Sequence, residues 1–551
     1  MKNNMTSLTT FSSVAPVANP AEPPHADRLP VWRASFRMAL VTTAGLVAAG
    51  LITTGLAGCA DMSGIHSQSS LRDASSLGLP ASDATANAST PAPAEWWRDF
   101  GDEQLNGLVA QALQNNPSLK LAQSRLARAQ AVNEVAGAAR LPQLNGGIDL
   151  TRQKYTANGA VPAPLAGSIR ESGTVQLSAS WELDFFGKYS AALESALGSE
   201  RAAQADTEAA RVLLASNVAR SYFQIARLNE QLGVAQRTLA QRQETLGLVK
   251  DRVNAGLDTQ LELRQSEGGL PEARLQIESL QEQLALAKNA LGALVGQPNV
   301  ALALVPPQMS AIKTGASITS ATAIPADLLG RRADITAARW RVEAASKDVV
   351  NAKTQFYPNI NLVAFAGFSS IGLNRLLDAG SQQWGVGPAL RLPIFDAGRL
   401  RANLRGKTAD LDGAVESYNA AVIDAVRDVA DQVASSQAIT RQQTEQRAAQ
   451  TAAEGAYDIA VQRYRAGLGN YLYVLTAETS VLNQRRQAVD LAARALDTQV
   501  GLIRALGGGY TPEAASATLL APEKIAATSG TQRAGGLFSS NTGATTPQAT
   551  R

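Results

Sequence analysis

The chain has 551 residues but only one cysteine, Cys59, and two histidines, His25 and His66. An internal disulfide framework is therefore excluded, and a zinc site or a Cys/His catalytic pair has almost no material. The 50 basic and 47 acidic residues leave a net charge of only +3, so the strongly basic surface of a nucleic-acid-binding protein is also missing. No complete phosphate-binding loop and no set of nucleophile, base and orienting group stands out in the sequence. We therefore expect no cofactor, no metal, no nucleic-acid partner and no enzymatic activity.

A run of apolar and small residues lies near the start of the chain. Residues 38–58 carry no charge, and three arginines precede them: Arg28, Arg33 and Arg37. A basic segment followed by an uncharged apolar run is the layout of a signal peptide. The run is long enough to span a membrane as a helix, but its content of Gly, Ala and Thr favours the signal peptide, which we place at residues 1–58.

The lone cysteine ends this run in the sequence Leu56-Ala57-Gly58-Cys59, which resembles the lipobox of bacterial lipoproteins. The resemblance implies cleavage before Cys59 and its modification with fatty acids such as palmitate. Two or more acyl chains anchor a protein stably to a membrane. The alternative, a buried structural cysteine, leaves the charges and the apolar run unexplained. Residue 60 is alanine, whereas the inner-membrane retention signal of enteric bacteria is an aspartate at that place, so we expect sorting to the outer membrane.

Both ends of the mature chain are poor in large apolar residues. Residues 59–95 are rich in Ser, Ala, Thr and Pro, a composition that buries too little surface to offset the entropy of ordering. We expect them to form a flexible tether behind the lipid anchor. Residues 509–551 are expected to form a C-terminal collar segment and a disordered tail.

An internal duplication lies between these ends. Matched motifs recur at matched spacings: 25 residues separate Pro117 from Pro142 and Ala333 from Pro358, and 69 residues separate Gly187 from Gly256 and Gly398 from Gly467. A fixed pattern of this kind indicates two copies of one structural unit. We place the first copy at residues 96–298 and the second at residues 324–508, with residues 299–323 as a collar segment between them.

The two 69-residue intervals contain no proline and many helix-forming residues. Each interval can therefore be one helix of about 100 Å. Apolar residues recur every seven positions along the first interval and after both glycines, as in a coiled-coil seam: Val218, Ile225, Leu232, Leu239, Leu246 and Val253; Leu263, Leu270, Ile277, Leu284 and Leu291; Leu475, Leu482, Val489, Leu496 and Ile503. Pro271 is expected to kink or break the first returning helix. Residues 434–450 are almost wholly polar or small, which suits either a helix beside a wet lumen or an exposed, solvated helix.

Between the helices the apolar period changes from about 3.6 to two, which indicates strands. We expect them near residues 143–152, 174–184, 359–368 and 384–394. About ten residues is the length that a membrane β-strand needs, but a soluble sheet with one buried face shows the same alternation. Four strands cannot close a membrane barrel, and an open edge cannot face lipid. If the strands span a membrane, their barrel is shared between chains.

Several motifs together resemble the TolC-like outer-membrane efflux proteins: Trp96-Trp97, Asn116-Pro117, residues 324–329 with Arg332-Ala333-Asp334-Ile335, residues 392–398, and residues 464–468. The lipobox places the chain near the lipoprotein branch, the NodT-type outer-membrane factors of resistance-nodulation-division efflux systems. The resemblance implies a mainly α protein with membrane β: a homotrimeric tube in which four strands per chain contribute to a shared twelve-stranded barrel, continued by a long α-helical coiled-coil barrel and a collar.

The function implied by the resemblance is that of the outer-membrane channel of a tripartite efflux or secretion system. Such a channel is embedded in outer-membrane lipid, extends its helical tube into the periplasm, and passes small molecules from a periplasmic adaptor and an inner-membrane pump to the exterior. A periplasmic adaptor lipoprotein is the alternative, since it too has a lipobox and a helical hairpin. An adaptor, however, would carry one hairpin flanked by soluble β-domains and no duplicated unit of strands and helices.

Six residues at the far ends of the helices are the site candidates that the resemblance implies. The turns at Gly256-Leu257 and Gly467-Leu468 resemble the helix-tip turns that meet the adaptor, where glycine permits a positive φ and a close approach of the partner backbone. Glu262, six residues after Gly256, matches an acidic aperture position of the family. Tyr473 stands at the same distance from Gly467, and this departure indicates an aperture that depends more on packing than on charge.

Overall fold

The computed structural model describes residues 61–72, 93–299, 304–313 and 331–511. The chain divides into two units, Met1–Asp61 and Met62–Arg551, and almost every described residue belongs to the second. The predicted signal peptide, the lipidation site at Cys59 and most of the predicted C-terminal tail lie outside the described residues.

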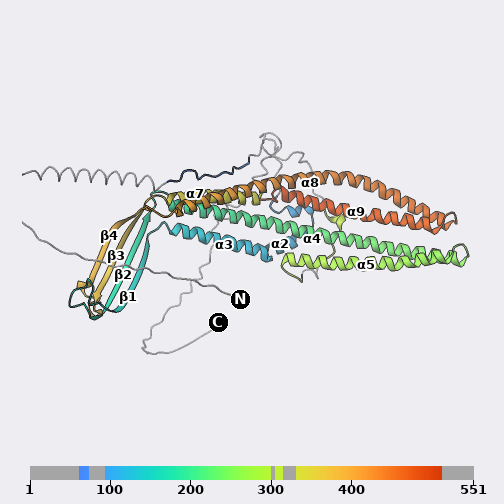
Figure 1. The fold of residues 1–551 in the computed structure, drawn as a ribbon. Helices are drawn as coiled ribbons and strands as arrows, with labels where there is room; N and C mark the ends of the chain where they lie inside the picture. Colours follow the sequence, from blue (N-terminus) through green and yellow to red (C-terminus); the bar gives the residue numbers. More distant parts are fainter. Residues whose placement is uncertain (1–60, 73–92, 300–303, 314–330, 512–551) are drawn as a thin grey trace, which may run out of the picture. The chain divides into compact units, whose positions relative to one another are not determined.

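The second unit contains two similar series of helices and strands (Figure 1). The first series consists of η2 (Trp96–Phe100), α2 (Glu103–Asn115), α3 (Pro117–Ala138), β1 (Gln143–Lys154), β2 (Ile169–Leu183), α4 (Lys188–Asn254) and α5 (Gln260–Val295). The second consists of α7 (Ala333–Thr354), β3 (Asn359–Ile371), β4 (Gln382–Arg391), α8 (Arg399–Arg465) and α9 (Tyr471–Ala505). The short helices η3 (Met309–Ala311), η6 (Leu373–Arg375) and η7 (Ala379–Ser381) lie in the connections.

An aspartate a few residues before each of the two longest helices accepts hydrogen bonds from free N–H groups at the helix start. Asp184 accepts hydrogen bonds from the backbone of Tyr189 and Ser190, at 3.1 and 2.8 Å, at the start of α4. Asp396 does the same for Gly398 and Leu400, at 3.0 and 2.8 Å, at the start of α8. The 67 residues of each helix then run without interruption.

Pro271 does not break α5, which continues from Gln260 to Val295. Of the two predicted outcomes, a kink or a break, the break was wrong, and the kink stays a prediction. Two glycines precede the proline, and Arg242 of α4 donates a hydrogen bond of 2.8 Å to the carbonyl oxygen of Gly269. This bond adds a contact between α4 and α5 just before the proline.

The seven-residue apolar pattern forms the contacts between helices. Most of the predicted seam residues are buried or pack against a buried cluster, among them Val218, Ile225, Leu246, Ile277, Leu291, Leu482, Val489, Leu496 and Ile503. Helix α4 packs against α5, α7, α3 and α9, and α8 packs against α9 and α7. The largest core joins η2 and α2 to α4, α5 and α9 through side chains such as Trp96, Phe100, Tyr222 and Phe223. None of the helices in the described ranges is long and apolar enough to cross a membrane.

The four strands form one antiparallel sheet in the order β1-β2-β3-β4. Its register aligns the predicted apolar positions across all strands: Leu144 lies opposite Ala179, which lies opposite Ala364, which lies opposite Val386. This apolar face is uncovered among the described residues, since Leu144 is 71% exposed and Val386 67% exposed. A soluble sheet would bury such a face, so the exposure argues against the soluble alternative.

All connections between the sheet and the long helices lie at one end of the sheet. Gln143, the first residue of β1, pairs near the end of β2, and Asn359, the first residue of β3, pairs with Arg391, the last residue of β4. We call this the helix end of the sheet. The turns at residues 155–168 and 372–381 lie at the opposite end (Figure 1).

Part of the predicted tether is bound to α8. The Ser67 hydroxyl and the backbone N–H groups of Gln68 and Ser69 all donate to Asp412 Oδ1, at 2.5 to 3.2 Å. Asn419, seven residues further along α8, exchanges two hydrogen bonds with the backbone of residues 70–72. Residues 67–72 are therefore held against α8 by two polar side chains of this distant helix, which composition could not show. That residues 59–95 form a tether stays a prediction.

Candidate functional site

The two turns at the far ends of the long helices have the same geometry. Gly256 and Gly467 have φ values of 71° and 72°. The next residues, Leu257 and Leu468, donate backbone hydrogen bonds of 2.9 and 2.8 Å to the carbonyls of Arg252 and Arg463. This arrangement is a Schellman-type helix end, which requires the left-handed backbone that glycine adopts without strain.

Both turns present apolar side chains and open space. Leu257 is 65% exposed and Leu468 is 70% exposed. A Cβ atom added to Gly256 would meet nothing within 4 Å, and one added to Gly467 would meet only Arg252 Nη1 at 4.0 Å. Within the described chain these glycines therefore serve the backbone turn and not a tight internal contact.

The aperture candidate Glu262 has a local role in the structure. It closes a capping box at the start of α5, in which its Oε2 accepts a 3.0 Å hydrogen bond from the backbone N–H of Thr259. The hydrogen bonds from Thr259 lower the pKa of Glu262. Tyr473 is exposed at the start of α9, where its backbone N–H donates to the side chain of Asn470. Among the described residues, Glu262 and Tyr473 make no hydrogen bond with each other.

The residues that join the two tips are Arg252, Asp258 and Tyr464, which we call the tip bridge. Arg252 pairs with Asp258 through two hydrogen bonds of 2.9 and 3.2 Å and donates a third, of 3.0 Å, to the carbonyl of Tyr464. The Tyr464 hydroxyl donates to the same Asp258 carboxylate, and the Arg252 guanidinium lies 4.6 Å from the centre of the Tyr464 ring. The bridge connects the α4–α5 turn to the end of α8.

The tip bridge is packed and electrostatically coupled. Tyr464 belongs to a buried cluster with Val249, Tyr471 and Val474. Burial alone would raise the pKa of Asp258, but the hydrogen bonds from Arg252 and Tyr464 hold it below its ordinary value. Burial and the Asp258 carboxylate raise the pKa of Tyr464, which therefore stays a hydrogen-bond donor.

Sequence reasoning missed this bridge because it compared the copies by their similarities. Arg252 has a counterpart in Arg463, but Asp258 corresponds to Gly469, so the carboxylate exists in only one copy. The difference between Asp258 and Gly469 was the feature of the sequence that could have pointed to the bridge. It marks a contact to which the two copies contribute different residues.

Further ion pairs connect α4 with α9 along their length. Three arginines of α4 pair with acidic residues of α9: Arg220 with Asp497 at 2.9 Å, Arg227 with Asp490 at 3.7 Å and Arg242 with Glu478 at 3.1 Å. The first two pairs are partly exposed and each stabilises the fold by less than about 1 kcal/mol. Arg242 and Glu478 are largely buried, with 14% and 8% of their side chains exposed.

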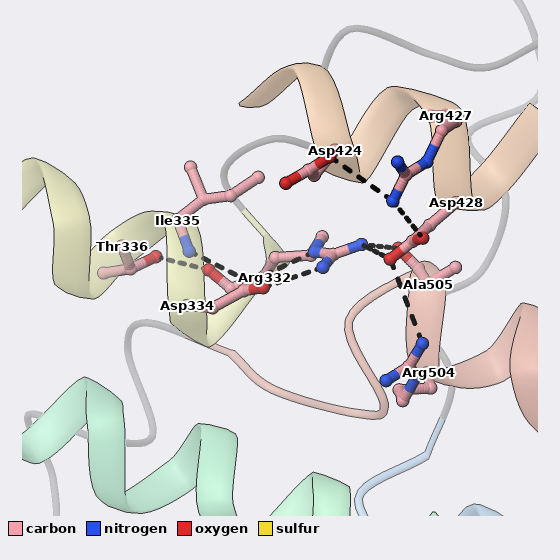
Figure 2. Close-up of polar contacts among 9 residues, drawn as sticks. All are labelled: Arg332, Asp334, Ile335, Thr336, Asp424, Arg427, Asp428, Arg504 and Ala505. Atoms are coloured by element: carbon pink, nitrogen blue, oxygen red, sulfur yellow. Dashed lines mark hydrogen bonds and ion pairs between the residues drawn. The ribbon is translucent and has the colours of Figure 1, made fainter. Parts of the chain in front are cut away.

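A second polar network lies where α7 begins, and we call it the collar network (Figure 2). Arg332 pairs with Asp334 at 2.7 Å and with Asp428 of α8 at 3.6 Å, and it donates to the carbonyl of Ala505 at the end of α9. Arg504 approaches Asp428 at 3.9 Å. Burial would lower the pKa of Arg332, but the two carboxylates raise it. The network ties the start of the second copy to its last two helices.

The chain end beside this network is closely packed. Gly507, Gly508 and Gly509 all have positive φ values, between 58° and 103°. A Cβ atom on them would lie 2.0 Å from the Arg331 carbonyl oxygen, 2.2 Å from Val212 and 2.4 Å from the Pro93 carbonyl oxygen, respectively. The three glycines therefore allow residues 507–509 to pack closely against Val212 of α4 and against the backbone of Arg331 and Pro93. Neither this region nor the rest of the described chain holds a group of three or more metal-binding side chains.

Residues 108–297 and 324–508 match the family of outer membrane efflux proteins, and these two segments coincide with the two series of strands and helices. The chain belongs to this family. The fusaric acid resistance protein FusA of Burkholderia cepacia is 38% identical over 374 residues, which cover 67% of this chain and 70% of FusA. The pyoverdine export outer membrane protein OpmQ of Pseudomonas aeruginosa is 34% identical over 423 residues, which cover 76% of this chain and 87% of OpmQ.

Solved structures agree with this assignment. The outer membrane protein VceC of Vibrio cholerae superposes with a TM-score of 0.72 at 38% identity, covering 76% of this chain and 100% of VceC. The CmeC outer membrane channel of Campylobacter jejuni gives a TM-score of 0.74 at 25% identity, covering 83% of this chain and 97% of CmeC. The predicted TolC-like fold is therefore confirmed.

This outer membrane efflux protein is the outer-membrane channel component of a tripartite efflux system. The matched family and the similar structures are channels, so the alternative of a periplasmic adaptor is not supported. The relatives are efflux and channel proteins and not enzymes.

Proposed function

We propose that three copies of this chain form a lipid-anchored channel whose helix tips dock on a periplasmic adaptor. An inner-membrane pump then delivers cargo through the adaptor, and the channel itself performs no chemistry. The observation that carries the docking assignment is the geometry of the two turns. Gly256-Leu257 and Gly467-Leu468 stand at equivalent ends of the duplicated helices, expose leucine side chains and leave open space around the glycines.

The trimer follows from the sheet. Among the described residues, strands β1 and β4 each pair with one neighbour, so both edges of the four-stranded sheet are open there. An unpaired edge cannot face lipid, because its N–H and C=O groups have no other partner there. Three chains of four strands reach a strand number that closes, as the resemblance to TolC-like channels implies.

The described residues that follow the proposed lipid anchor pack against α8. Met62 and Ile65 pack against a cluster that includes Leu400 and Leu404. Helix α8 begins eight residues after β4 ends, so these residues lie near the helix end of the sheet. The proposed lipidation site, Cys59, precedes Met62 by three residues in the sequence.

The cargo class is a small organic molecule. FusA is named for resistance to fusaric acid and OpmQ for export of pyoverdine, which are two different compounds. Such a range fits a channel that transmits what a pump selects. For the aperture we propose Glu262 and Tyr473 as lining residues, with the tip bridge holding the two hairpins of each chain together in the closed state.

The docking assignment is tested by Gly256→Trp and Gly467→Trp together. Tryptophan at a positive φ adds strain of about 1–3 kcal/mol, and its bulk falls on the surface that meets the adaptor. We expect efflux and cross-linking to the adaptor to be lost while the trimer persists. Drug accumulation in cells, cross-linking and native electrophoresis measure these three outcomes.

The control is Gly380→Trp, which places the same side chain in open space at the opposite end of the sheet. It should leave efflux unchanged. Normal efflux in the double tip variant would remove the docking assignment, and loss of the trimer would show that the turns are structural.

The lipid anchor is tested by mass spectrometry of the N-terminal peptide from membrane-extracted protein. We expect the peptide to begin at Cys59 and to carry acyl groups. An unmodified Cys59 thiol, or a chain that retains Arg33, would refute the anchor and leave the channel assignment intact.

A further inference from the structure

A pocket of about 580 Å³ lies at the helix end of the sheet, where the strands meet the long helices. Its lining comes from the end of β2, the start of β3, the end of β4 and the first turn of α8. The channel function described above does not use it. We call it the junction pocket.

One part of the junction pocket is apolar and faces outward. Phe186 stacks on Tyr357 with ring centres 4.9 Å apart and an angle of 10° between the rings. Ile394 and Phe395 also line the pocket, and they are 76% and 89% exposed. Side chains this large and this exposed indicate a surface that something covers in the working protein.

The other part of the pocket carries positive charge. The acidic groups around it are already satisfied: Glu182 pairs with Lys188 at 2.8 Å, and Asp184 and Asp396 accept the N–H groups of α4 and α8. Arg391 and Arg399 line the pocket, and neither guanidinium has an ion-pair partner among the described residues. The pocket therefore presents two arginines that have no ion-pair partner among the described residues, beside an apolar surface.

The position of the pocket indicates what covers it. The exposed apolar face of the sheet is the surface that lipid contacts in an outer-membrane channel, and the pocket begins where the strands of that sheet end. At this depth aromatic side chains meet lipid headgroups, and arginine pairs with phosphate through two parallel hydrogen bonds. An anionic group attached to an acyl chain satisfies both parts of the pocket.

We propose that the junction pocket binds an anionic phospholipid of the membrane leaflet that faces the periplasm. Arg391 and Arg399 bind the phosphate diester, and Ile394 and Phe395 contact the adjoining part of the acyl chains. The rival occupant is the acylated N-terminus of the chain itself, since Met62 and Ile65 pack near Leu400, which lines the pocket. The acyl and glyceryl groups on a lipidated cysteine carry no anion, so they would leave both arginines without a counter-charge.

The inference rests on insertion of the channel in the outer membrane. Its test measures lipid binding and trimer formation separately, so that failure of one can be told from failure of the other. Full-length protein with p-benzoylphenylalanine in place of Phe395 is reconstituted in vesicles of phosphatidylethanolamine with a minor share of phosphatidylglycerol, irradiated and analysed by mass spectrometry. We expect phospholipid adducts in which phosphatidylglycerol is enriched at least about fivefold over its share of the vesicle, the preference that one interfacial cation supplies. Native electrophoresis confirms the trimer in the same samples.

The charge is tested by Arg391→Gln with Arg399→Gln, which should bring phosphatidylglycerol down to its bulk share while the adducts themselves persist. The matched control is Arg441→Gln with Arg494→Gln, which removes two arginines from the shafts of α8 and α9 and should leave the enrichment unchanged. An adduct with the Cys59 peptide, with a neighbouring chain or with no lipid at all in an intact trimer overturns the proposal. Loss of the trimer itself would instead count against the shared barrel.

Discussion

Arg242 of α4 lies between two acidic side chains from different helices. It pairs with Glu478 of α9 at 3.1 Å and with Glu272 of α5 at 2.9 Å. Burial raises the pKa of Glu478, although Arg242 opposes the rise. The arginine therefore neutralises a carboxylate that is largely shielded from water, since only 8% of the Glu478 side chain is exposed. The two partners differ in their other contacts, because Arg242 also pairs with Glu272.

This inequality predicts different effects for the two partners. Arg242→Met leaves Glu478 as an uncompensated buried charge and should cost roughly 3–5 kcal/mol of stability. Glu478→Gln keeps an acceptor for Arg242, which retains Glu272, and should cost less than about 1.5 kcal/mol. Thermal unfolding of the detergent-solubilised protein, followed by circular dichroism, compares the two variants. Equal losses for both would contradict the assignment of the buried charge to Glu478.

At the scale of the elements, the sequence predicted the parts of the fold that depend on period. The seven-residue apolar pattern predicted the packed faces of α4, α5 and α9, and the alternation of apolar and polar residues predicted β1 to β4. A helix or strand that keeps one face apolar must repeat its apolar residues at these periods. The turns at Gly256 and Gly467 were also predictable, since a positive φ needs glycine.

Contacts that depend on single polar side chains could not be predicted. The tip bridge needs Asp258, which only one copy carries, and Asp412 and Asn419 bind residues 67–72 from more than 340 positions away along the chain. Neither contact leaves a period in the sequence. The continuity of α5 through Pro271 was likewise not visible in the local sequence.

The tip bridge predicts a pH dependence of the link between the two hairpins. Arg252 and Tyr464 lower the pKa of Asp258, so the bridge stabilises the closed tips above the ordinary aspartate pKa of about 4, and this contribution is lost as the pH falls through the lowered value. We expect channel conductance in planar bilayers to be low at neutral pH and to rise only below about pH 4.

The variant Asp258→Asn removes the charge and should raise conductance already at neutral pH and weaken its acid dependence. Asp251→Asn, seven residues earlier on the exposed side of α4, is the matched control and should behave as the unchanged protein. If both variants conduct alike, the bridge does not hold the tips.

At the scale of the whole molecule, the sheet determines how many chains are needed. Strand β4 has 10 residues and β1 has 12, and each has one side without a partner in the described part of the chain. Every unpaired backbone group in lipid costs several kcal/mol, so two open edges of this length are incompatible with an inserted monomer. The apolar face is continuous across all four strands, which requires that the closed structure keep this face outward.

We therefore expect the detergent-solubilised mature protein to have about three times the mass of one chain, because twelve strands close where four cannot. Light scattering coupled to size exclusion measures this mass after subtraction of the bound detergent, and circular dichroism follows the β-content of the same fractions. Dilution should not yield a monomer with intact strands, since separation exposes both edges at once and the sheet loses the partners that β1 and β4 have in neighbouring chains. A monodisperse monomer that retains its β-content would refute the shared barrel, and with it the argument that the edges of this sheet set the number of chains.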